Sequence, residues 1–361
     1  MKILHTESSC GWGGQEIRIL DEAQGMSSRG HEVSLVAPRE SRIYEAALER
    51  GLNAKALPIA RKNLTGLLAM RRWLKAHLAD VVNCHSSTDS WLAALACATL
   101  ARAPALVRTR HVSAAIPNNL PTRWLYRSAT AHVVTTGEAL RMQLLRDNGL
   151  SPESVTSVPT GIDAERFVPG DRDSARRLAG LPSGRPLVGI VATLRSWKGH
   201  RYLIEALHGL PPEVGLVIVG DGPQRRNIEA RVRELGLGGR VWLAGNQADV
   251  LPWLQSLDVF ALPSYANEGV PQALVQAMLC GLACVTTAAG SIGELARDGA
   301  TAIVVAAEDA ADLRRGLNGA LGDARLRARL GGAAREHCAA NFGVKTMLDR
   351  MERVFRDAAH L

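Results

Sequence analysis

Residues Glu268–Gln276 (EGVPQALVQ) join one carboxylate to the predicted start of a helix. Pro271 suits the first turn of a helix, because the N–H group that proline lacks would have no partner there. The N–H groups of Gly269 and Val270 could then bind an anion such as a phosphate. A carboxylate would repel a phosphate beside it, so Glu268 needs another role, such as binding the hydroxyl groups of a sugar. The alternative is an ordinary acidic residue at a helix N-terminus.

Arg195 and Lys198 form a second candidate site, in the loop that follows an apolar segment at 187–192. Arginine supplies a planar fork of donors and lysine a point charge, and both can reach a diphosphate. Doubly wound α/β domains bind their ligands at the carboxyl ends of the strands, which favours phosphate binding over two solvated surface cations. Gly222, in the turn after the next apolar segment, is a weaker indication of the same binding edge.

The first half of the chain carries related features. Gly13 and Gly14 follow the first predicted strand and precede a helix, where glycines let the backbone approach a phosphate. The dinucleotide-binding pattern G-x-G-x-x-G fails because Glu16 stands at its third glycine, and a purely structural turn is the alternative. His111 follows the apolar segment 105–109, so an imidazole could act at the equivalent edge, although a lone histidine is more often structural.

Predicted strands and helices alternate along the chain in two successive series. The predicted strands are 2–5, 31–37, 81–85, 105–109 and 131–135 in the first series, and 187–192, 215–219, 240–244, 259–262, 283–286 and 302–305 in the second. Alternation of this kind predicts parallel sheets with helices on both faces. A chain of 361 residues is also longer than one hydrophobic core usually serves. We therefore predict two α/β domains, at 1–168 and 169–345, followed by a final helical segment at 346–361.

Positive charge is concentrated in one part of the chain. Residues 61–127 hold ten Lys or Arg and only two Asp, in a chain whose net charge is +8. This asymmetry suggests an anionic partner such as a phosphate, a nucleic acid or acidic lipid headgroups, and a solvated basic surface is the alternative. Arg123, Trp124 and Arg127 combine cations with an aromatic side chain, which suits a membrane interface. No recognised motif supports nucleic-acid binding.

Several other classes of protein receive little support from the sequence. The six cysteines contain no C-x-x-C pair, so we expect reduced thiols rather than a disulfide framework or a zinc site. Asp171 and Asp173 spell the D-x-D of some metal sites, but they fall in a polar stretch at 169–186 that is predicted to be a linker. The sequence shows no signal peptide and no apolar run of roughly 18 residues, so a cytoplasmic protein is expected.

Taken in order, these segments resemble the GT-B glycosyltransferases, specifically the retaining family 4 (glycosyl transferases group 1) of the bacterial lipopolysaccharide and cell-envelope type. The segments that carry the resemblance are Gly13–Glu16, Pro159–Phe167, Arg195–Gly199, Gly220–Pro223, Phe260–Ser264, Glu268–Gly281 and Gly290–Glu294. The resemblance implies a GT-B fold, in which two Rossmann-like, doubly wound parallel-sheet domains face each other across a cleft. It also implies that the final helix, at 346–361, crosses back to the N-terminal domain.

The resemblance further implies which residues bind a nucleoside diphosphate sugar, without a metal. The implied donor-binding residues are Gly13, Gly14, Arg195, Lys198, Gly222, Asn246, Glu268, Gly269, Val270 and Gln276. Glu268 would contact the hydroxyls of the donor sugar, and His111 would lie near the reacting anomeric carbon. One position departs from the family, because Gln276 replaces a second Glu that normally accepts hydrogen bonds from the ribose hydroxyls. An uncharged amide with one acceptor oxygen weakens that contact by about 1 kcal/mol.

The expected activity is retaining transfer of a sugar from a UDP- or GDP-sugar to a hydroxyl of a lipopolysaccharide-like glycan or glycolipid. No cofactor is expected, and the protein is expected in the cytoplasm, peripherally on the inner face of the membrane. The basic and aromatic residues assigned to the acceptor or the membrane are Arg108, Arg110, Arg123, Trp124 and Arg127. A small soluble acceptor or a phosphorylated one also fits the charge. A GT-B nucleotide-sugar epimerase and a non-catalytic sugar-nucleotide-binding homologue are the alternatives.

Overall fold

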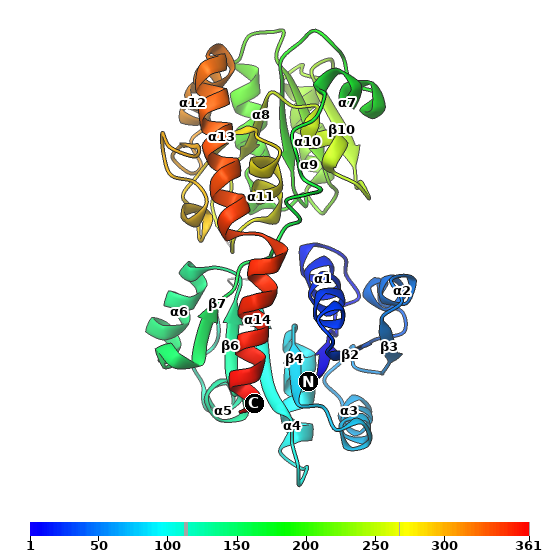
Figure 1. The fold of residues 1–361 in the computed structure, drawn as a ribbon. Helices are drawn as coiled ribbons and strands as arrows, with labels where there is room; N and C mark the ends of the chain where they lie inside the picture. Colours follow the sequence, from blue (N-terminus) through cyan, green and yellow to red (C-terminus); the bar gives the residue numbers. More distant parts are fainter. Residues whose placement is uncertain (112–114, 267, 361) are drawn as a thin grey trace. The chain divides into compact units, whose positions relative to one another are not determined.

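The computed structural model describes residues 1–111, 115–266 and 268–360. The chain divides into two compact units (Figure 1). The first consists of Met1–Gly161 together with the chain from Lys345 onward, and the second of Ile162–Val344. The boundary lies after Gly161 instead of after the predicted residue 168. Each unit is a parallel β-sheet flanked by helices.

The sheet of the first unit has seven strands in the order β3-β2-β1-β4-β5-β6-β7. The strands are β1 (Lys2–Thr6), β2 (Glu32–Ala37), β3 (Asn53–Ala56), β4 (Val81–Cys84), β5 (Ala105–Arg110), β6 (His132–Thr135) and β7 (Val155–Ser157). Sequence patterns do not predict β3 and β7, because the first has the largely polar sequence NAKA and the second has only three residues. Since β1, β4 and β5 are parallel neighbours, their carboxyl ends lie side by side at one edge of the sheet.

Helices cover both faces of this sheet (Figure 1). They are α1 (Gly14–Ser28), α2 (Arg42–Glu49), α3 (Leu64–His77), α4 (Ser87–Cys97), α5 (Leu120–Trp124), a π-helical turn η1 (Leu125–Ala129), α6 (Glu138–Asn148), a 3₁₀ turn η2 (Pro152–Ser154) and α14 (Val344–Ala359). The sequence of α14 is strongly amphipathic. Its buried residues are Met347, Leu348, Met351, Val354 and Phe355.

Polar contacts as well as apolar ones attach α14 to the first unit. The guanidinium of Arg18, on α1, is fully buried and lies 3.8 Å from the sulfur of Met351. Arg29 forms ion pairs with Asp349 at 2.7 Å and with Glu352 at 3.0 Å. The first unit is therefore assembled from two segments that are far apart in the sequence.

The sheet of the second unit has six strands in the order β10-β9-β8-β11-β12-β13. The strands are β8 (Leu187–Val191), β9 (Gly215–Val219), β10 (Val241–Gly245), β11 (Val259–Leu262), β12 (Ala283–Thr286) and β13 (Ile303–Val304). The central strands β8, β9 and β11 have almost wholly apolar sequences, as expected for parallel strands that are buried on both faces.

The helices of the second unit include one in the stretch predicted to be a linker. They are α7 (Arg172–Ala179), η3 (Ser196–Lys198), α8 (His200–His208), α9 (Arg225–Glu234), α10 (Leu251–Gln255), α11 (Gln272–Leu279), η4 (Ile292–Glu294), α12 (Ala310–Gly322) and α13 (Ala324–Asn341). Asp171 caps α7, because its carboxylate accepts a hydrogen bond from the N–H of Ser174 at 3.0 Å. The D-x-D sequence is thus a helix start. Among the described residues, no helix has the length and apolar character needed to cross a membrane.

Candidate active site

Backbone hydrogen bonds tie together the loops at the carboxyl edge of the second sheet. The N–H of Leu194 donates to the carbonyl of Asp221 at 3.0 Å, which joins the loop after β8 to the loop after β9. The N–H of Tyr265 donates to the carbonyl of Trp197 at 2.9 Å, which joins the β8 loop to the loop after β11. This edge therefore collects most of the predicted donor-binding residues of the second unit: Arg195, Lys198, Gly222, Asn246 and Glu268.

Two glycines allow backbone segments to approach each other closely at this edge. Gly199 has a φ of +75°, and a Cβ there would lie 2.0 Å from the carbonyl oxygen of Pro263. Gly290 has a φ of +57°, and a Cβ there would lie 2.1 Å from the carbonyl oxygen of Glu268. Both positions need a left-handed backbone and no side chain. The two glycines thus hold the loops that carry Lys198 and Glu268 in fixed positions.

Replacing Gly199 with alanine is expected to lower the free energy of unfolding of the second unit by about 2 kcal/mol or more, because strain at positive φ adds to a steric clash. Gly184→Ala is the matched control, since Gly184 has a φ of +80° and an added Cβ would meet nothing within 4 Å. The control should cost only about 1 kcal/mol. Urea unfolding measures both variants. Equal losses would mean that the Pro263 carbonyl shifts aside without cost.

Lys198 and Glu268 form the central contact of this site. The Lys198 Nζ donates to the Glu268 Oε1 at 2.6 Å, and only 5% of the Glu268 side chain is exposed. A buried carboxylate needs such a partner, because an unpaired charge is costly away from water. Arg195 is exposed, and its guanidinium lies 5.7 Å from the centre of the Trp197 ring. The arrangement thus offers one partly buried and one exposed cation beside a buried carboxylate.

The remaining predicted residues of this site lie on adjoining elements. Val270 is buried and Gly269 is half-buried just before α11, and Gln276 is half-buried within that helix. The N–H of Gly220 donates to the carbonyl of Gly245 at 2.8 Å. This bond places the exposed Asn246, which follows β10, close to the turn that contains Gly222.

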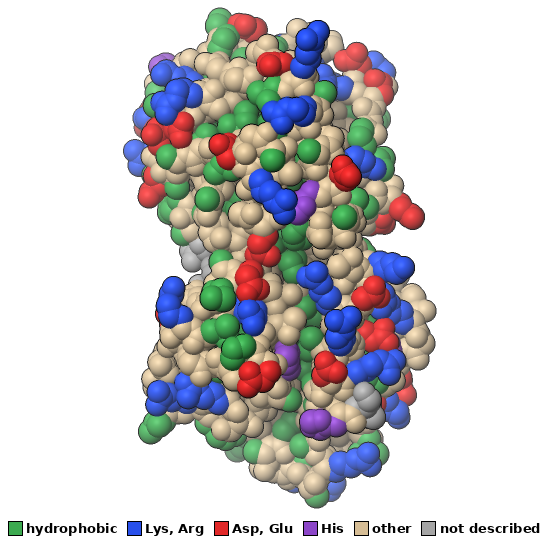
Figure 2. Space-filling view, turned by 60° about the vertical axis from the view of Figure 1, so that its left-hand side comes forward, with side chains coloured by type: hydrophobic (Ala, Val, Ile, Leu, Met, Phe, Trp, Pro, Cys, Tyr) green, Lys and Arg blue, Asp and Glu red, His purple; other side chains and the backbone are tan. Residues whose placement is uncertain are grey.

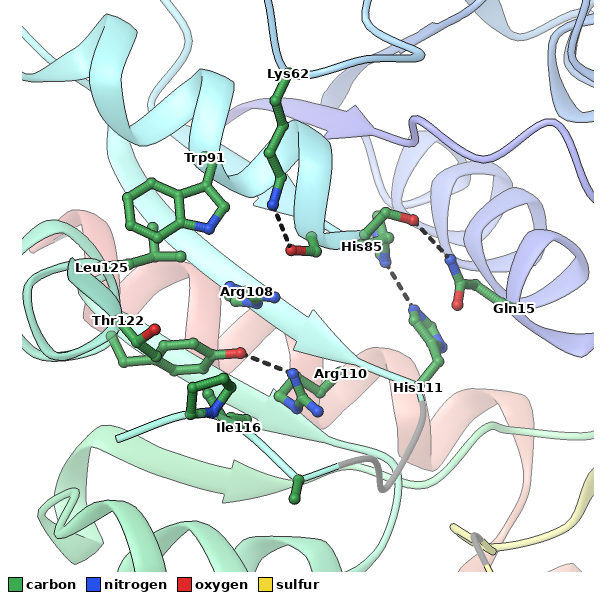
Figure 3. A pocket seen from close by; sticks show the side chains of 15 residues that line it. Gln15, Lys62, His85, Trp91, Arg108, Arg110, His111, Ile116, Thr122 and Leu125 are labelled. Atoms are coloured by element: carbon green, nitrogen blue, oxygen red, sulfur yellow. Dashed lines mark hydrogen bonds between the residues drawn. The ribbon is translucent and has the colours of Figure 1, made fainter. Parts of the chain in front are cut away.

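A separate pocket of about 450 Å³ lies in the first unit (Figure 3). It opens at the carboxyl edge of the first sheet, over β4 and β5. Its lining residues are Gln15, Lys62, His85, Ser86, Ser87, Trp91, Arg108, Arg110, His111, Ala115, Ile116, Pro117, Thr122, Leu125 and Tyr126. The predicted residues His111, Arg108 and Arg110 are therefore together in one cavity.

Three histidines form a hydrogen-bonded line that ends in this pocket. His85 Nδ1 lies 3.0 Å from His111 Nε2, and His85 Nε2 lies 3.0 Å from His5 Nδ1. Burial, followed by the charge of Arg18, lowers the pKa of His5 to about 3, and burial also lowers the pKa values of His85 and His111 well below the usual range. All three imidazoles are thus neutral at physiological pH. His111 can therefore supply a donor or an acceptor, but no charge.

Two carboxyl groups that the sequence analysis does not single out lie behind the pocket. Asp89 accepts hydrogen bonds from the hydroxyl of Thr6 at 2.7 Å and from the N–H groups of His85 and Ser86 at 3.0 and 2.9 Å. Burial raises the pKa of Glu7, and the neighbouring Asp89 raises it further. Burial also raises the pKa of Asp89, but its hydrogen bonds and the charge of Arg108 oppose that rise, so the pKa of Glu7 is the higher of the two. Ser86 and Asp89 form a capping box at the start of α4. This S-x-x-D pattern is the sequence feature from which the position of Asp89 at a helix start could have been predicted.

The other residues predicted for the first unit lie at the start of α1 or on α5 and η1. Gly13 precedes α1 in an extended conformation, and Gly14 is the first residue of that helix. Trp124 is half-buried, and its ring stacks on Trp91 with a centroid distance of 6.0 Å. Arg123 and Arg127 are exposed and donate to Asn118 and to the carbonyl of Asn148, respectively. On the face shown in Figure 2, basic and acidic side chains are interspersed on each unit.

Comparison with known proteins now gives the family. Residues 12–166 match the family described as Glycosyltransferase Family 4, and residues 171–337 match Glycosyl transferases group 1. The chain is 28% identical to 2-deoxystreptamine glucosyltransferase of Streptomyces kanamyceticus, over 85% of this chain and 88% of that protein. It is 26% identical to UDP-Gal:alpha-D-GlcNAc-diphosphoundecaprenol alpha-1,3-galactosyltransferase of Escherichia coli, over 80% of this chain and 79% of that protein.

A solved structure shows the same fold. Anabaena HepE, solved in complex with UDP-glucose, superposes with a TM-score of 0.84 at 23% identity, covering 99% of this chain and 100% of that one. The two family matches together take in most of the sequence, and each of the two units is a parallel-sheet α/β unit. The chain belongs to the family 4, group 1 glycosyltransferases and has the GT-B fold.

Proposed function

We propose that this glycosyltransferase moves a sugar, with retention of configuration and without a metal, from a UDP-sugar to a hydroxyl of a cell-envelope glycan or glycolipid. The observation that carries the proposal is the 2.6 Å contact between Lys198 and the buried Glu268, with Arg195 in the same loop as Lys198. These two cations and the carboxylate lie at the carboxyl edge of a parallel sheet, where such folds bind nucleotides. The UDP-glucose bound to Anabaena HepE supports a uridine donor.

Each group at this edge has a separate role in the proposed reaction. The leaving diphosphate gains negative charge in the transition state, and Arg195 and Lys198 would stabilise that charge. The N–H groups of Gly269 and Val270 would add to this stabilisation at the start of α11. Glu268 would accept hydrogen bonds from the hydroxyls of the donor sugar. With two cations placed for the diphosphate, we propose that no metal is needed.

Gln276 determines how the ribose is held in this proposal. A glutamate at that position would accept hydrogen bonds from both ribose hydroxyls, whereas the amide of Gln276 has one acceptor oxygen and two N–H donors. The exchange weakens donor binding by about 1 kcal/mol without removing it. Gln276→Glu should then bind UDP more tightly. Weaker binding would mean that the site is built around glutamine.

The first unit would hold the acceptor. His111 lies in its pocket as a neutral imidazole, available to the reacting groups as a hydrogen-bonding partner. A glycolipid acceptor is supported by the Escherichia coli relative, whose name specifies a diphosphoundecaprenol. It is also supported by Leu120, which is 78% exposed next to Arg123 and Arg127. We propose the inner face of the cytoplasmic membrane as the place of the reaction.

Purified protein and a panel of UDP- and GDP-sugars test the proposal. UDP should raise the melting temperature by preferential binding to the folded state. Transfer to a glycan acceptor should continue in EDTA, and NMR of the product should show the anomeric configuration of the donor. Conversion of the donor alone into an epimer would identify an epimerase. Binding of UDP without any turnover would identify a non-catalytic homologue.

A further inference from the structure

Arg108 is a buried cation without a carboxylate partner. It lies on β5, only 6% of it is exposed, and its Nη1 has no hydrogen-bond partner. Among the described residues, no Asp or Glu lies within ion-pair distance of its guanidinium. The guanidinium lies 4.4 Å from the centre of the Tyr126 ring. This cation–π contact attracts the charge but does not replace the hydrogen bond that Nη1 lacks. A charge in this situation is costly unless an anion binds it.

The pocket in front of Arg108 is lined by three cations, two from β5 and one from the segment before α3 (Figure 3). Arg110 follows on the same strand and donates to the hydroxyl of Tyr126 at 2.7 Å. Lys62 approaches from the segment before α3 and donates to the hydroxyl of Ser87 at 3.1 Å. The lining residues comprise these three cations and no Asp or Glu. Their arrangement concentrates positive charge inside a cavity rather than on an open surface.

The nearest acidic groups offset this charge only in part, because the charge of Asp89 acts on Arg108 without forming an ion pair with it. The oxygens of Asp89 are engaged by the hydroxyl of Thr6 and by two backbone N–H groups. Glu7 lies beside Ser86 and Gln15, and burial raises its pKa so that it is protonated near neutral pH. Neither carboxyl lines the pocket. A ligand would therefore have to bring the missing negative charge.

We propose that the pocket binds a phosphate group carried by the acceptor, with Arg108 and Arg110 as its main donors and Lys62 on its other side. This inference rests on the proposed function, because it takes the occupant of the pocket to be the acceptor. Arginine forks and a lysine match the oxygens of a phosphate. A cavity of about 450 Å³ has room for a sugar phosphate, with Trp91 as an apolar wall. The phosphate belongs either to a soluble phosphorylated compound or to a lipid diphosphate.

Calorimetric titration of the full chain with matched probes tests this inference. Glucose 6-phosphate should bind, and glucose should bind at least about tenfold more weakly, since a charge-assisted hydrogen bond contributes that much. Geranyl diphosphate and inorganic diphosphate separate the two sources. A preference for geranyl diphosphate indicates a lipid acceptor, and equal binding of the two indicates a soluble one. Glucose binding as tightly as glucose 6-phosphate would overturn the inference.

Arg108→Met separates ligand binding from a structural role. The variant should bind glucose 6-phosphate at least about tenfold more weakly. Its melting temperature should stay equal or rise, because a buried charge without an ion-pair partner has been removed. Arg102→Met, at an exposed position of the same basic segment, is the matched control and should change neither. A lower melting temperature with unchanged glucose 6-phosphate binding would show that Arg108 is purely structural. If Arg108→Met does not fold, Lys62→Met at the exposed rim gives the same test of binding.

Titration with UDP on the same preparations keeps the two proposals distinguishable. UDP should bind Arg108→Met as it binds the unaltered chain, and Arg195→Met should lose UDP binding but keep glucose 6-phosphate binding. If the protein binds glucose 6-phosphate but does not bind UDP, the result would contradict the proposed function and support the phosphate pocket. Binding of UDP without glucose 6-phosphate would contradict the phosphate pocket alone.

Discussion

Replacing Lys198 with alanine is expected to lower kcat/KM for sugar transfer by about a hundredfold or more, the usual cost of removing one preorganised donor to a developing anion. In the free protein the Nζ of Lys198 is 2.6 Å from Glu268, so the donor diphosphate would compete with that carboxylate for the same ammonium group. The loss should appear mainly in kcat if the cation acts on charge that develops in the transition state. Steady-state kinetics with a UDP-sugar measure the effect.

A second variant is needed because Lys198→Ala also leaves a buried carboxylate without its cation. Glu268→Gln keeps the shape of the side chain and removes the charge, and it should likewise slow transfer because an amide holds sugar hydroxyls less well. Arg201→Ala is the matched control, since Arg201 is on the next helix and its side chain is 75% exposed. Near-normal rates in both Lys198→Ala and Glu268→Gln would contradict the assignment of the donor site.

Replacing Glu22 with alanine is expected to lower the free energy of unfolding of the first unit by about 3–5 kcal/mol. Glu22 lies 3.6 Å from Arg18 and both side chains are fully buried. In the variant, the Arg18 guanidinium keeps its hydrogen bond to the carbonyl of Val158 at 2.6 Å and longer contacts to Thr160 and Met351. Asn83 loses the acceptor to which its amide donates at 3.1 Å. Burial itself raises the pKa of Glu22, and Arg18 opposes that rise.

Thermal and urea unfolding measure this loss, with Glu49→Ala at an exposed position of α2 as the control. The double variant Arg18→Met with Glu22→Leu should recover most of the stability, because a buried ion pair replaced as a whole by apolar groups is often nearly neutral. A loss of less than about 1 kcal/mol in Glu22→Ala would mean that water reaches Arg18.

The apolar strands, and the loops that carry the proposed donor-binding residues, could be located from the sequence because their signals are local. Val259–Leu262 reads directly as a buried strand, and the loop residues Lys198 and Glu268 follow such strands in both cases. The helix α7 was missed because its residues are mostly polar, so that its buried contacts are few. The edge strand β3 was missed for a similar reason, since edge strands do not need an apolar sequence.

The pocket of the first unit could be predicted only in part, because it depends on the order of the strands. His5, His85 and His111 are far apart in the sequence and meet only because β1, β4 and β5 are neighbours in the sheet. The sequence placed Arg108 at the end of a strand, but it could not show that the side chain is buried with an unpartnered Nη1. Long-range packing decides both points.

The discontinuity of the first unit has a consequence for biosynthesis. A ribosome makes all of Ile162–Val344 before it completes α14, so the second unit can finish folding while the first still lacks one of its helices. Until then Arg18 has no contact with Met351, and the ring of His5 is not covered by Phe355. The first unit to be synthesised is therefore the last to be completed, and a nascent chain released early would carry a finished second unit and an incomplete first unit.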